Sequence, residues 1–399
     1  MVDESVVAVP QTDIAAAARQ RRSERYELQA IAAQILARHP HPAGENSRWR
    51  VGICCKKPLP DGVKIMLTDV PGLDHPVGSY AGVQVCASVW TCAVCAARIA
   101  QRRAAEIAAA TALHHAAGGR MLMLTLTIPH CSDDELQHLL GRRSASDRSG
   151  LRGAIHRLQN SRLWKGHRRR GQLVSGLAAL YGYIGGIRAL EVTLGANGWH
   201  PHVHILLLVG RELRTAERRD LEHELFVEWR RSCSAAGIRE PNRQHGISLD
   251  PAWDASEYLS KLGYARSGWG PESELARNST KRGRGTSLGP FDLLREFSST
   301  GDCEPMEKFS TYATALFRAH HVHWRPGLKQ AMGLADLSDE AIVTGTDEDA
   351  RVSLEIGDYE WRCVLAQPPS VRAQILTLAE RDGPRAVIDF LDSLRLVRY

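Results

Sequence analysis

The sequence predicts an α+β protein with a strand-rich core packed by helices, a small cysteine-rich module, and helical appendages at the N- and C-termini. Compact apolar and β-branched runs such as 121–128 and 201–209 indicate buried strands. Stretches rich in Ala, Gln and Arg, such as 14–38, are typical of helices. Five of the nine cysteines fall within 48–105, which marks that segment as a distinct module.

The composition limits the cellular setting. A chain of 399 residues is long enough for two or three domains. Its net charge of +6 is only mildly basic, so the distribution of charge matters more than the total. No apolar run is long enough to span a bilayer, and the N-terminus, with Asp3 and Glu4, lacks a secretory signal. We therefore expect a cytoplasmic protein with reduced cysteines and no membrane partner.

The chain divides into four expected parts. A polar, partly helical segment covers 1–47, and the cysteine-rich module covers 48–105. A strand-rich domain follows over 106–330. Residues 331–399 look like a separate appendage, with an acidic linker around 347–349, a short apolar stretch and two helices split by Gly383 and Pro384.

The strand-rich domain contains a predicted hairpin. The run 121–128, closed by Pro129, indicates one buried strand. Two further strands, 184–194 and 201–209, flank a turn of the sequence Gly-Ala-Asn-Gly, so they should be antiparallel neighbours. A weaker strand is expected at 247–249, and a helix from 253 to about 264.

Alternating histidines on the last of these hairpin strands indicate a metal site. Side chains alternate along a strand, so His202 and His204 share one face, and His200 has the same parity at the edge. Glu191 lies across the hairpin. Two imidazoles, a carboxylate and open water positions suit Mn²⁺ or Mg²⁺ acting on a phosphate. Surface or satisfied core histidines are the alternative, but unpaired imidazoles on an apolar strand are costly.

A tyrosine on the predicted helix at 253–264 is a candidate nucleophile. Asp254, Tyr258 and Lys261 lie on one helical face. A phenol, with a pKa of about 10, is a poor nucleophile, but an adjacent ammonium and a polarised phosphate would lower the barrier. Taken alone, this pattern is more typical of a half-buried helical tyrosine with a solvated lysine than of a nucleophile. The histidine strand is the feature that favours a catalytic role for this tyrosine.

The cysteine cluster has the spacing of a structural zinc site. Cys92 and Cys95 form a Cys-x-x-Cys pair before a helix, Cys86 lies nearby, and either Cys54 or Cys55 supplies a fourth thiol. Four thiolates would form a closed site without catalytic function. The alternative is that these are small buried hydrophobic residues.

A basic segment before the hairpin favours nucleic-acid contact. Residues 141–170 contain ten Lys and Arg residues and one acid. This density, which includes Arg168, Arg169 and Arg170, suits a phosphate backbone. A solvated helix face with a flexible loop is the alternative.

The ordered motifs resemble the HUH endonucleases, and more narrowly the single-tyrosine replication initiators of rolling-circle plasmids. The resemblance covers roughly 54–328. Three motifs follow the family order, at 124–127, 198–204 and 258–261, with the sequences Leu-Thr-Leu-Thr, Gly-Trp-His-Pro-His-Val-His and Tyr-Leu-Ser-Lys. The regions 280–284, 290–294 and 324–328 are also similar to one plasmid-initiator group, and similar cysteines precede its nuclease core.

The resemblance implies a fold and a reaction. It places the metal histidines on a central strand of an antiparallel sheet and the tyrosine on a packed helix, and it makes 106–330 a nuclease domain. Tyr258 would attack a scissile phosphate of origin DNA, keep the 5′-phosphate as an ester, and free a 3′-hydroxyl. The ester would allow rejoining without ATP. Lys281 and Arg282, after the tyrosine, would contact DNA.

One departure and two rival functions accompany this interpretation. Many relatives carry Glu four residues before the tyrosine, where this chain has Asp254; we favour it over Glu257 as the base of the second step. No helicase-type phosphate loop is visible in the sequence, so a host helicase and polymerase are expected partners. A single-tyrosine transposase or a relaxase would use the same chemistry, although relaxases usually place the tyrosine before the histidines. A non-enzymatic zinc-containing DNA-binding regulator is the alternative from another class.

Overall fold

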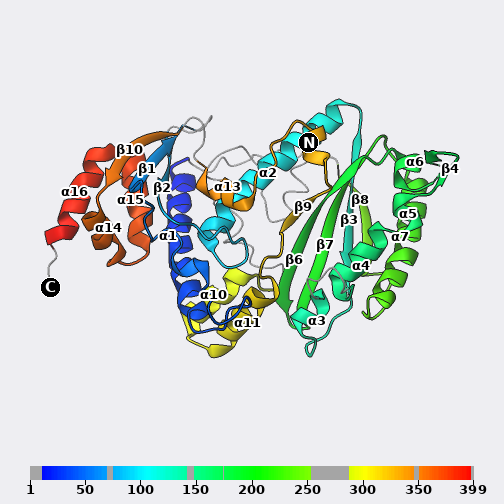
Figure 1. Ribbon diagram of the computed structural model, residues 1–399, viewed down its shortest axis with the longest axis horizontal. Coiled ribbons are helices and arrows are strands. Elements are labelled where there is room, and N and C mark those ends of the chain that lie inside the picture. Colours follow the sequence, from blue (N-terminus) through cyan, green and yellow to red (C-terminus); the bar gives the residue numbers. More distant parts are fainter. Residues whose placement is uncertain are drawn as a thin grey trace, which may run out of the picture.

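A five-stranded antiparallel sheet dominates one half of the computed structural model, which describes residues 11–69, 75–141, 148–173, 175–252, 287–345 and 350–396 (Figure 1). The strand order is β8-β3-β7-β6-β9. The strands are β3 (Arg120–Thr127), β6 (Gly185–Gly195), β7 (Gly198–Val209), β8 (Ile247–Pro251) and β9 (Val322–Trp324). The expected central antiparallel sheet is confirmed, and β3, β6, β7 and β8 fall close to the runs predicted from sequence.

Strand β7 lies at the centre of this sheet, between β3 and β6. A two-residue turn at Ala196 and Asn197 joins it to β6, and the register pairs Glu191 with His202. Gly198 begins β7 with a φ of +84°, and a Cβ there would come within 2.7 Å of the Cys131 carbonyl oxygen. Glycine is therefore required both by the backbone conformation and by the close approach of the loop after β3.

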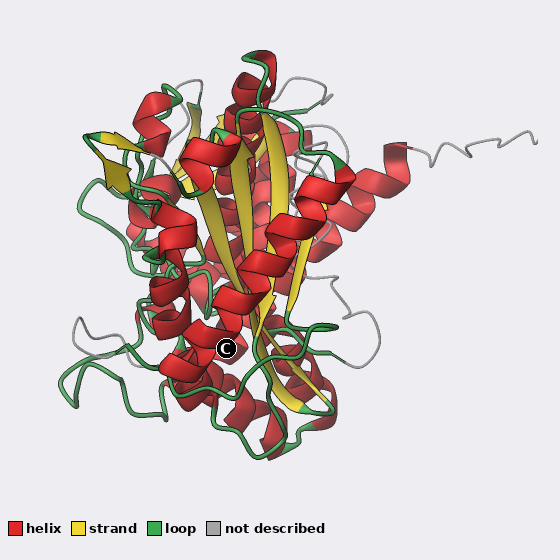
Figure 2. Cartoon of the chain, turned by 90° about the vertical axis from the view of Figure 1, so that its right-hand side faces the viewer, coloured by secondary structure: helices red, strands yellow, loops and turns green. Residues whose placement is uncertain are grey.

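Helices pack against one face of the sheet. The alternate β7 residues Val203 and Ile205 are about 1% exposed and belong to the main core. Helices α4 (Gly150–Gln159) and α7 (Thr215–Ala235) supply the facing apolar side chains, and Figure 2 shows helices flanking the strands. Trp229 of α7 is fully buried, and its indole Nε1 donates to the Thr127 carbonyl at 3.1 Å, which ties the helix to β3.

The opposite face is divided into an apolar half and a polar half. Helix α2 (Ala93–Ala116) covers the apolar half, where its Ile107 packs with Met123, Leu206 and Leu208 in a second core. Toward the β6–β7 turn, the same face carries polar side chains instead. These are Thr125, Thr127, Glu191, His200, His202 and His204.

The N-terminal, cysteine-rich and C-terminal segments form a second body beside the sheet (Figure 1). Its three-stranded antiparallel sheet has the order β10-β1-β2. The elements are α1 (Gln11–Leu36), η1 (Arg50–Gly52), β1 (Val63–Thr68), β2 (Val77–Ala81), β10 (Arg351–Ile356), α14 (Asp358–Leu365), α15 (Ser370–Arg381) and α16 (Gly383–Leu396).

This second body differs from the four-part division expected from the sequence. Strand β10 belongs to the expected C-terminal appendage, yet it pairs with β1 of the cysteine-rich module, from Val63 opposite Ile356 to Leu67 opposite Arg351. Trp361 donates from Nε1 to the Lys56 carbonyl at 2.7 Å. Two strands alone do not form a stable sheet, so each segment needs the others to bury its apolar face.

The remaining elements connect the two bodies or extend the sheet domain. These elements are α3 (Leu136–Leu140), α5 (Arg162–Lys165), β4 (Arg168–Arg169), β5 (Gln172–Leu173), α6 (Leu177–Tyr181), α10 (Pro290–Thr300), α11 (Cys303–Ala315), α12 (Leu328–Ala331) and α13 (Asp339–Thr344).

None of the helices in the described ranges is long and apolar enough to cross a membrane.

The shared core predicts that C-terminal substitutions destabilise the whole second body. Trp361→Ala removes a side chain that is 1% exposed, so we expect it to lower the free energy of unfolding by about 3–5 kcal/mol. Tyr359→Ala, on the same helix at 45% exposure, is the matched control and should change little. Thermal and urea unfolding measure both. Equal stability of the two variants would contradict the shared core and favour an independent C-terminal appendage.

Candidate metal centres

Glu191, His202 and His204 converge on the polar half of the sheet. Because Glu191 is opposite His202 in the β6–β7 register, its carboxylate reaches both imidazoles. Glu191 Oε2 lies 3.3 Å from His202 Nε2 and 3.6 Å from His204 Nε2. One ligand atom from each residue lies within 4.8 Å of the others. The structure thus brings together three of the four residues predicted as metal ligands.

The second ring nitrogen of each of these histidines contacts a neighbouring polar group. His202 Nδ1 lies 3.4 Å from the His200 carbonyl oxygen, an acceptor that favours the tautomer with the proton on Nδ1. His204 Nδ1 lies 3.0 Å from Thr125 Oγ1, a hydroxyl that can accept the same kind of hydrogen bond. In the tautomer with the proton on Nδ1, each Nε2 would face Glu191 with a lone pair, as a metal ligand requires.

The donor set fits a divalent cation. Ligand atoms held at about 2.1 Å around one ion stand roughly 3–3.6 Å apart, close to the separations of Glu191 from the two imidazoles. Two nitrogens and one carboxylate oxygen leave coordination positions for water or a phosphate oxygen. The arrangement could therefore hold Mn²⁺ or Mg²⁺ and expose it to a substrate.

His200 faces a different partner, His130. Their rings approach through His200 Nδ1 and His130 Nε2 at 2.7 Å, while His130 Nδ1 lies 3.0 Å from the Asn197 carbonyl oxygen. Burial, with smaller effects of His202 and His130, lowers the pKa of His200 to about 4, so its imidazole is neutral. Sequence patterns did not indicate His130. It follows β3, and only the long-range β3–β7 register brings it beside the histidine strand.

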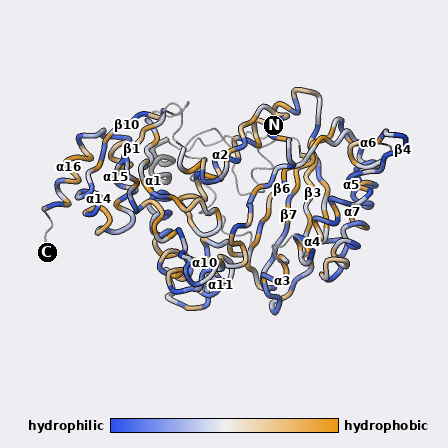
Figure 3. Tube along the Cα trace, in the orientation of Figure 1, coloured by the Kyte–Doolittle hydropathy of each residue, from blue (hydrophilic) through white to orange (hydrophobic). Residues whose placement is uncertain are grey.

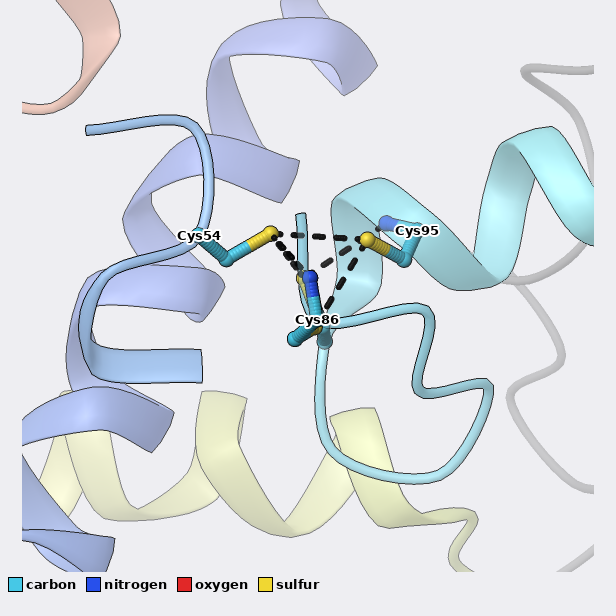
Figure 4. A group of neighbouring side chains, drawn as sticks. Cys54, Cys86 and Cys95 are labelled. Atoms are coloured by element: carbon cyan, nitrogen blue, oxygen red, sulfur yellow. Dashed lines mark hydrogen bonds between the residues drawn. The ribbon is translucent and has the colours of Figure 1, made fainter. Parts of the chain in front are cut away.

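The cysteine cluster has the geometry of a four-thiolate site. Cys54, Cys86, Cys92 and Cys95 place their sulfurs within 4.8 Å of one another. Sulfurs at about 2.3 Å around a tetrahedral zinc stand roughly 3.8 Å apart. The separations of Cys54 from Cys92 and Cys95 are 3.8 and 3.4 Å, and Cys86 lies 3.6 Å from Cys95. Figure 4 shows Cys54, Cys86 and Cys95 converging from two loops and the start of α2.

The structure places Cys54 rather than Cys55 in this group. The Cys55 sulfur lies 3.9 Å from that of Cys54 and outside the cluster of four. Cys55 has a φ of +51°, and its carbonyl oxygen accepts from Arg372 Nη1 at 3.0 Å. This backbone conformation separates the directions of the two adjacent side chains, which no spacing rule anticipates.

Hydrogen-bond donors surround the thiols. Gln29 of α1 donates from Nε2 to Cys92 Sγ at 3.3 Å, and the Cys86 amide donates to Cys54 Sγ at 3.4 Å. Gln29 is fully buried, and its Oε1 accepts from Arg372 of α15 at 3.1 Å. Donors aimed at sulfur favour thiolates, so these contacts support metal binding over a cluster of neutral thiols.

The basic residues predicted to contact DNA lie on an exposed hairpin. Arg168 and Arg169 form β4, which pairs with β5, and Arg170 occupies the turn. All three are exposed, and Arg168 donates from Nη1 to the Gly171 carbonyl oxygen at 2.7 Å. Figure 3 shows the hydrophilic character of β4, and Figure 1 places it at the end of the sheet away from α3 and the β6–β7 turn.

Five predicted functional residues lie outside the described residues. They are Asp254, Tyr258, Lys261, Lys281 and Arg282, and Glu257 lies there as well. The described chain ends at Ala252 after β8 and resumes at Ser287. Leu288 then forms an isolated antiparallel bridge with Leu194 on β6, the strand that carries Glu191.

Comparison with known proteins gives two relatives, both from Streptomyces. The chain is 29% identical over 333 residues to a Streptomyces lividans protein named Protein rep, covering 71% of this chain and 73% of that one. It is 32% identical over 255 residues to a Streptomyces cyanogenus protein named Neomycin resistance protein. That alignment covers 55% of this chain and 58% of the relative, less than two thirds of its length. No protein-family model matches the chain, and no solved structure matches it significantly.

The cysteine geometry predicts a zinc-dependent second body. Cys92→Ser should reduce bound zinc from about one ion per chain to near zero and lower the melting temperature, because metal binding contributes to folding. Cys303→Ser, at an exposed cysteine, is the matched control and should change neither quantity. Elemental analysis and thermal unfolding provide the measurements. Purified wild-type protein without zinc would refute the assignment.

Proposed function

We propose that this chain is a replication initiator that nicks and rejoins origin DNA through a 5′-phosphotyrosine intermediate. The observation that carries the proposal is the Glu191–His202–His204 group on the central strand of an antiparallel sheet. Its support comes from the ordered HUH-like motifs and from the likeness to Protein rep. The proposed place of action is the cytoplasm.

The proposed reaction is a transesterification with Tyr258 as nucleophile. Its phenolic oxygen would attack the scissile phosphorus and the bond from phosphorus to the 3′ oxygen would break, so the leaving strand takes up a proton and ends in a 3′-hydroxyl. A divalent ion held by Glu191, His202 and His204 would supply Lewis-acid stabilisation of the phosphate. Lys261, which the sequence predicts to lie one helical turn from the tyrosine, would favour the phenolate.

The proposed cycle needs further groups and partners. Asp254 would serve as the base that activates a water in the second step. Arg168, Arg169, Arg170, Lys281 and Arg282 would neutralise DNA phosphates. The freed 3′-hydroxyl would prime a host polymerase, and a host helicase would separate the strands. The cysteine cluster would hold a structural zinc ion.

Two rival functions make different predictions for one experiment. A zinc-containing DNA-binding regulator has no use for the Glu191–His202–His204 group and would not cleave DNA. A single-tyrosine transposase or relaxase would cleave, but at a transposon end or a transfer origin. Single-stranded oligonucleotides that tile the DNA around the coding gene, incubated with Mn²⁺, therefore separate all three by whether and where a nick forms.

The first prediction from this function concerns the metal. His202→Ala and His204→Ala should each lower nicking by at least 100-fold, even in excess Mn²⁺, because each removes a ligand. EDTA should stop the wild-type enzyme. His138→Ala, at an exposed position on α3, is the control and should nick normally. Robust nicking in EDTA would refute the metal mechanism.

The second concerns the nucleophile. Tyr258→Phe removes only the attacking oxygen, so DNA binding should persist while nicking and the covalent adduct disappear. Denaturing gel electrophoresis with labelled oligonucleotide detects the adduct, and a gel shift measures binding. An adduct that still forms in Tyr258→Phe would shift the assignment to another tyrosine, with Tyr264 as the next candidate.

A further inference from the structure

His130 and His200 form a hydrogen-bonded pair whose proton positions follow from their surroundings. The Asn197 carbonyl oxygen can only accept, so His130 Nδ1, at 3.0 Å, must carry a proton. In a neutral imidazole the other nitrogen is then an acceptor, so His130 Nε2 accepts from His200 Nδ1 at 2.7 Å. The remaining nitrogen of His200, Nε2, is left with a lone pair.

The pair continues the row of imidazoles on β7. Ring centroids are spaced 4.8 Å from His130 to His200, 4.8 Å from His200 to His202, and 4.9 Å from His202 to His204. His202 resembles His200 in that its Nδ1 also lies against a neighbouring group, the His200 carbonyl oxygen, at 3.4 Å. Only His202 and His204, however, share the compact group with Glu191.

We propose that His130 is a positioning residue of the metal centre, which fixes His200 with an unprotonated Nε2 beside the Glu191–His202–His204 group. There His200 accepts a hydrogen bond from a water bound to the ion, rather than ligating the ion itself. The inference rests on the divalent ion of the proposed function. Three protein ligands leave positions for water on Mn²⁺ or Mg²⁺, and an acceptor beside such a water holds it in place.

The loop that carries His130 is rigid enough for this role. Its bond to Asn197 reaches the tip of the β6–β7 turn, and the next residue, Cys131, packs its carbonyl against Gly198. The Cys131 amide in turn donates to Asp134 Oδ2 at 2.7 Å. His130 is thus held on both sides, by the turn and by its own loop. A ring fixed in this way can determine the orientation of the His200 ring.

Isosteric variants can separate the two bonds of His130. In His130→Asn the amide nitrogen takes the place of Nδ1, which keeps the bond to Asn197 but leaves nothing near His200. In His130→Gln the amide oxygen takes the place of Nε2 and can still accept from His200 Nδ1. We expect Mn²⁺ affinity to fall about 10–100-fold in His130→Asn and in His130→Ala, and to stay near the wild-type value in His130→Gln.

The experiment titrates full-length, metal-stripped and zinc-reloaded protein with Mn²⁺, following the free ion by electron paramagnetic resonance. His138→Ala is the matched control at an exposed histidine. Nitrogen NMR of histidine-labelled protein adds a second readout. His200 should be protonated at Nδ1 in wild type and His130→Gln, and should become a mixture of tautomers in His130→Asn.

The outcomes distinguish this inference from the proposed function. Normal Mn²⁺ affinity and an unchanged His200 tautomer in His130→Asn would overturn the role of His130 while leaving the metal centre intact. Weak binding in His130→Gln together with normal binding in His130→Asn would assign the effect to the loop anchor at Asn197, and would also overturn it. A wild-type protein that binds no Mn²⁺ would refute the metal centre and, with it, the positioning role.

Discussion

The antiparallel register of β7 between β3 and β6 is the constraint on which the rest of the sheet domain depends. A shift of one residue would exchange the two faces, sending Val203 and Ile205 away from α4 and α7 and burying histidines among apolar side chains. The apolar core thus enforces the register, and the register places Glu191 opposite His202. Apolar packing on one face of the sheet therefore determines which polar side chains lie together on the opposite face.

This dependence explains which parts of the site could be predicted from the sequence. His202, His204 and Glu191 lie on two strands joined by a short hairpin, so alternation and turn length alone bring them together. Thr125 and His130 come from β3 and its following loop, more than sixty residues earlier in the chain than the hairpin residues, and only long-range pairing reveals them. Local patterns therefore locate the candidate ligands on one hairpin and miss the polar groups that contact the histidines from β3 and its loop.

The second body was harder to predict for a related reason. Strand β10 is short, and five of its six positions are exposed or partly exposed at a sheet edge, so its sequence has the weak signal of a linker. Its partner β1 lies almost three hundred residues earlier. The contacts of Arg372 with Gln29 and Cys55 likewise join α15 to the cysteine group, which the cysteine spacing could not show.

Helix α2 connects the cysteine group to the sheet that carries the histidine group, although the two groups have different kinds of ligands. Cys92 and Cys95 lie at its start, and Ile107, further along, packs on the same sheet face that carries Glu191, His202 and His204. The cysteine group has four buried or half-buried thiols, which close the coordination of a soft-ligand ion, whereas the histidine group leaves positions open beside a hard carboxylate. A zinc ion at the cysteines would therefore hold α2 without taking part in the proposed DNA cleavage. A divalent ion at the histidine group would keep positions for a phosphate oxygen, because the sheet supplies too few ligands there to complete its coordination shell.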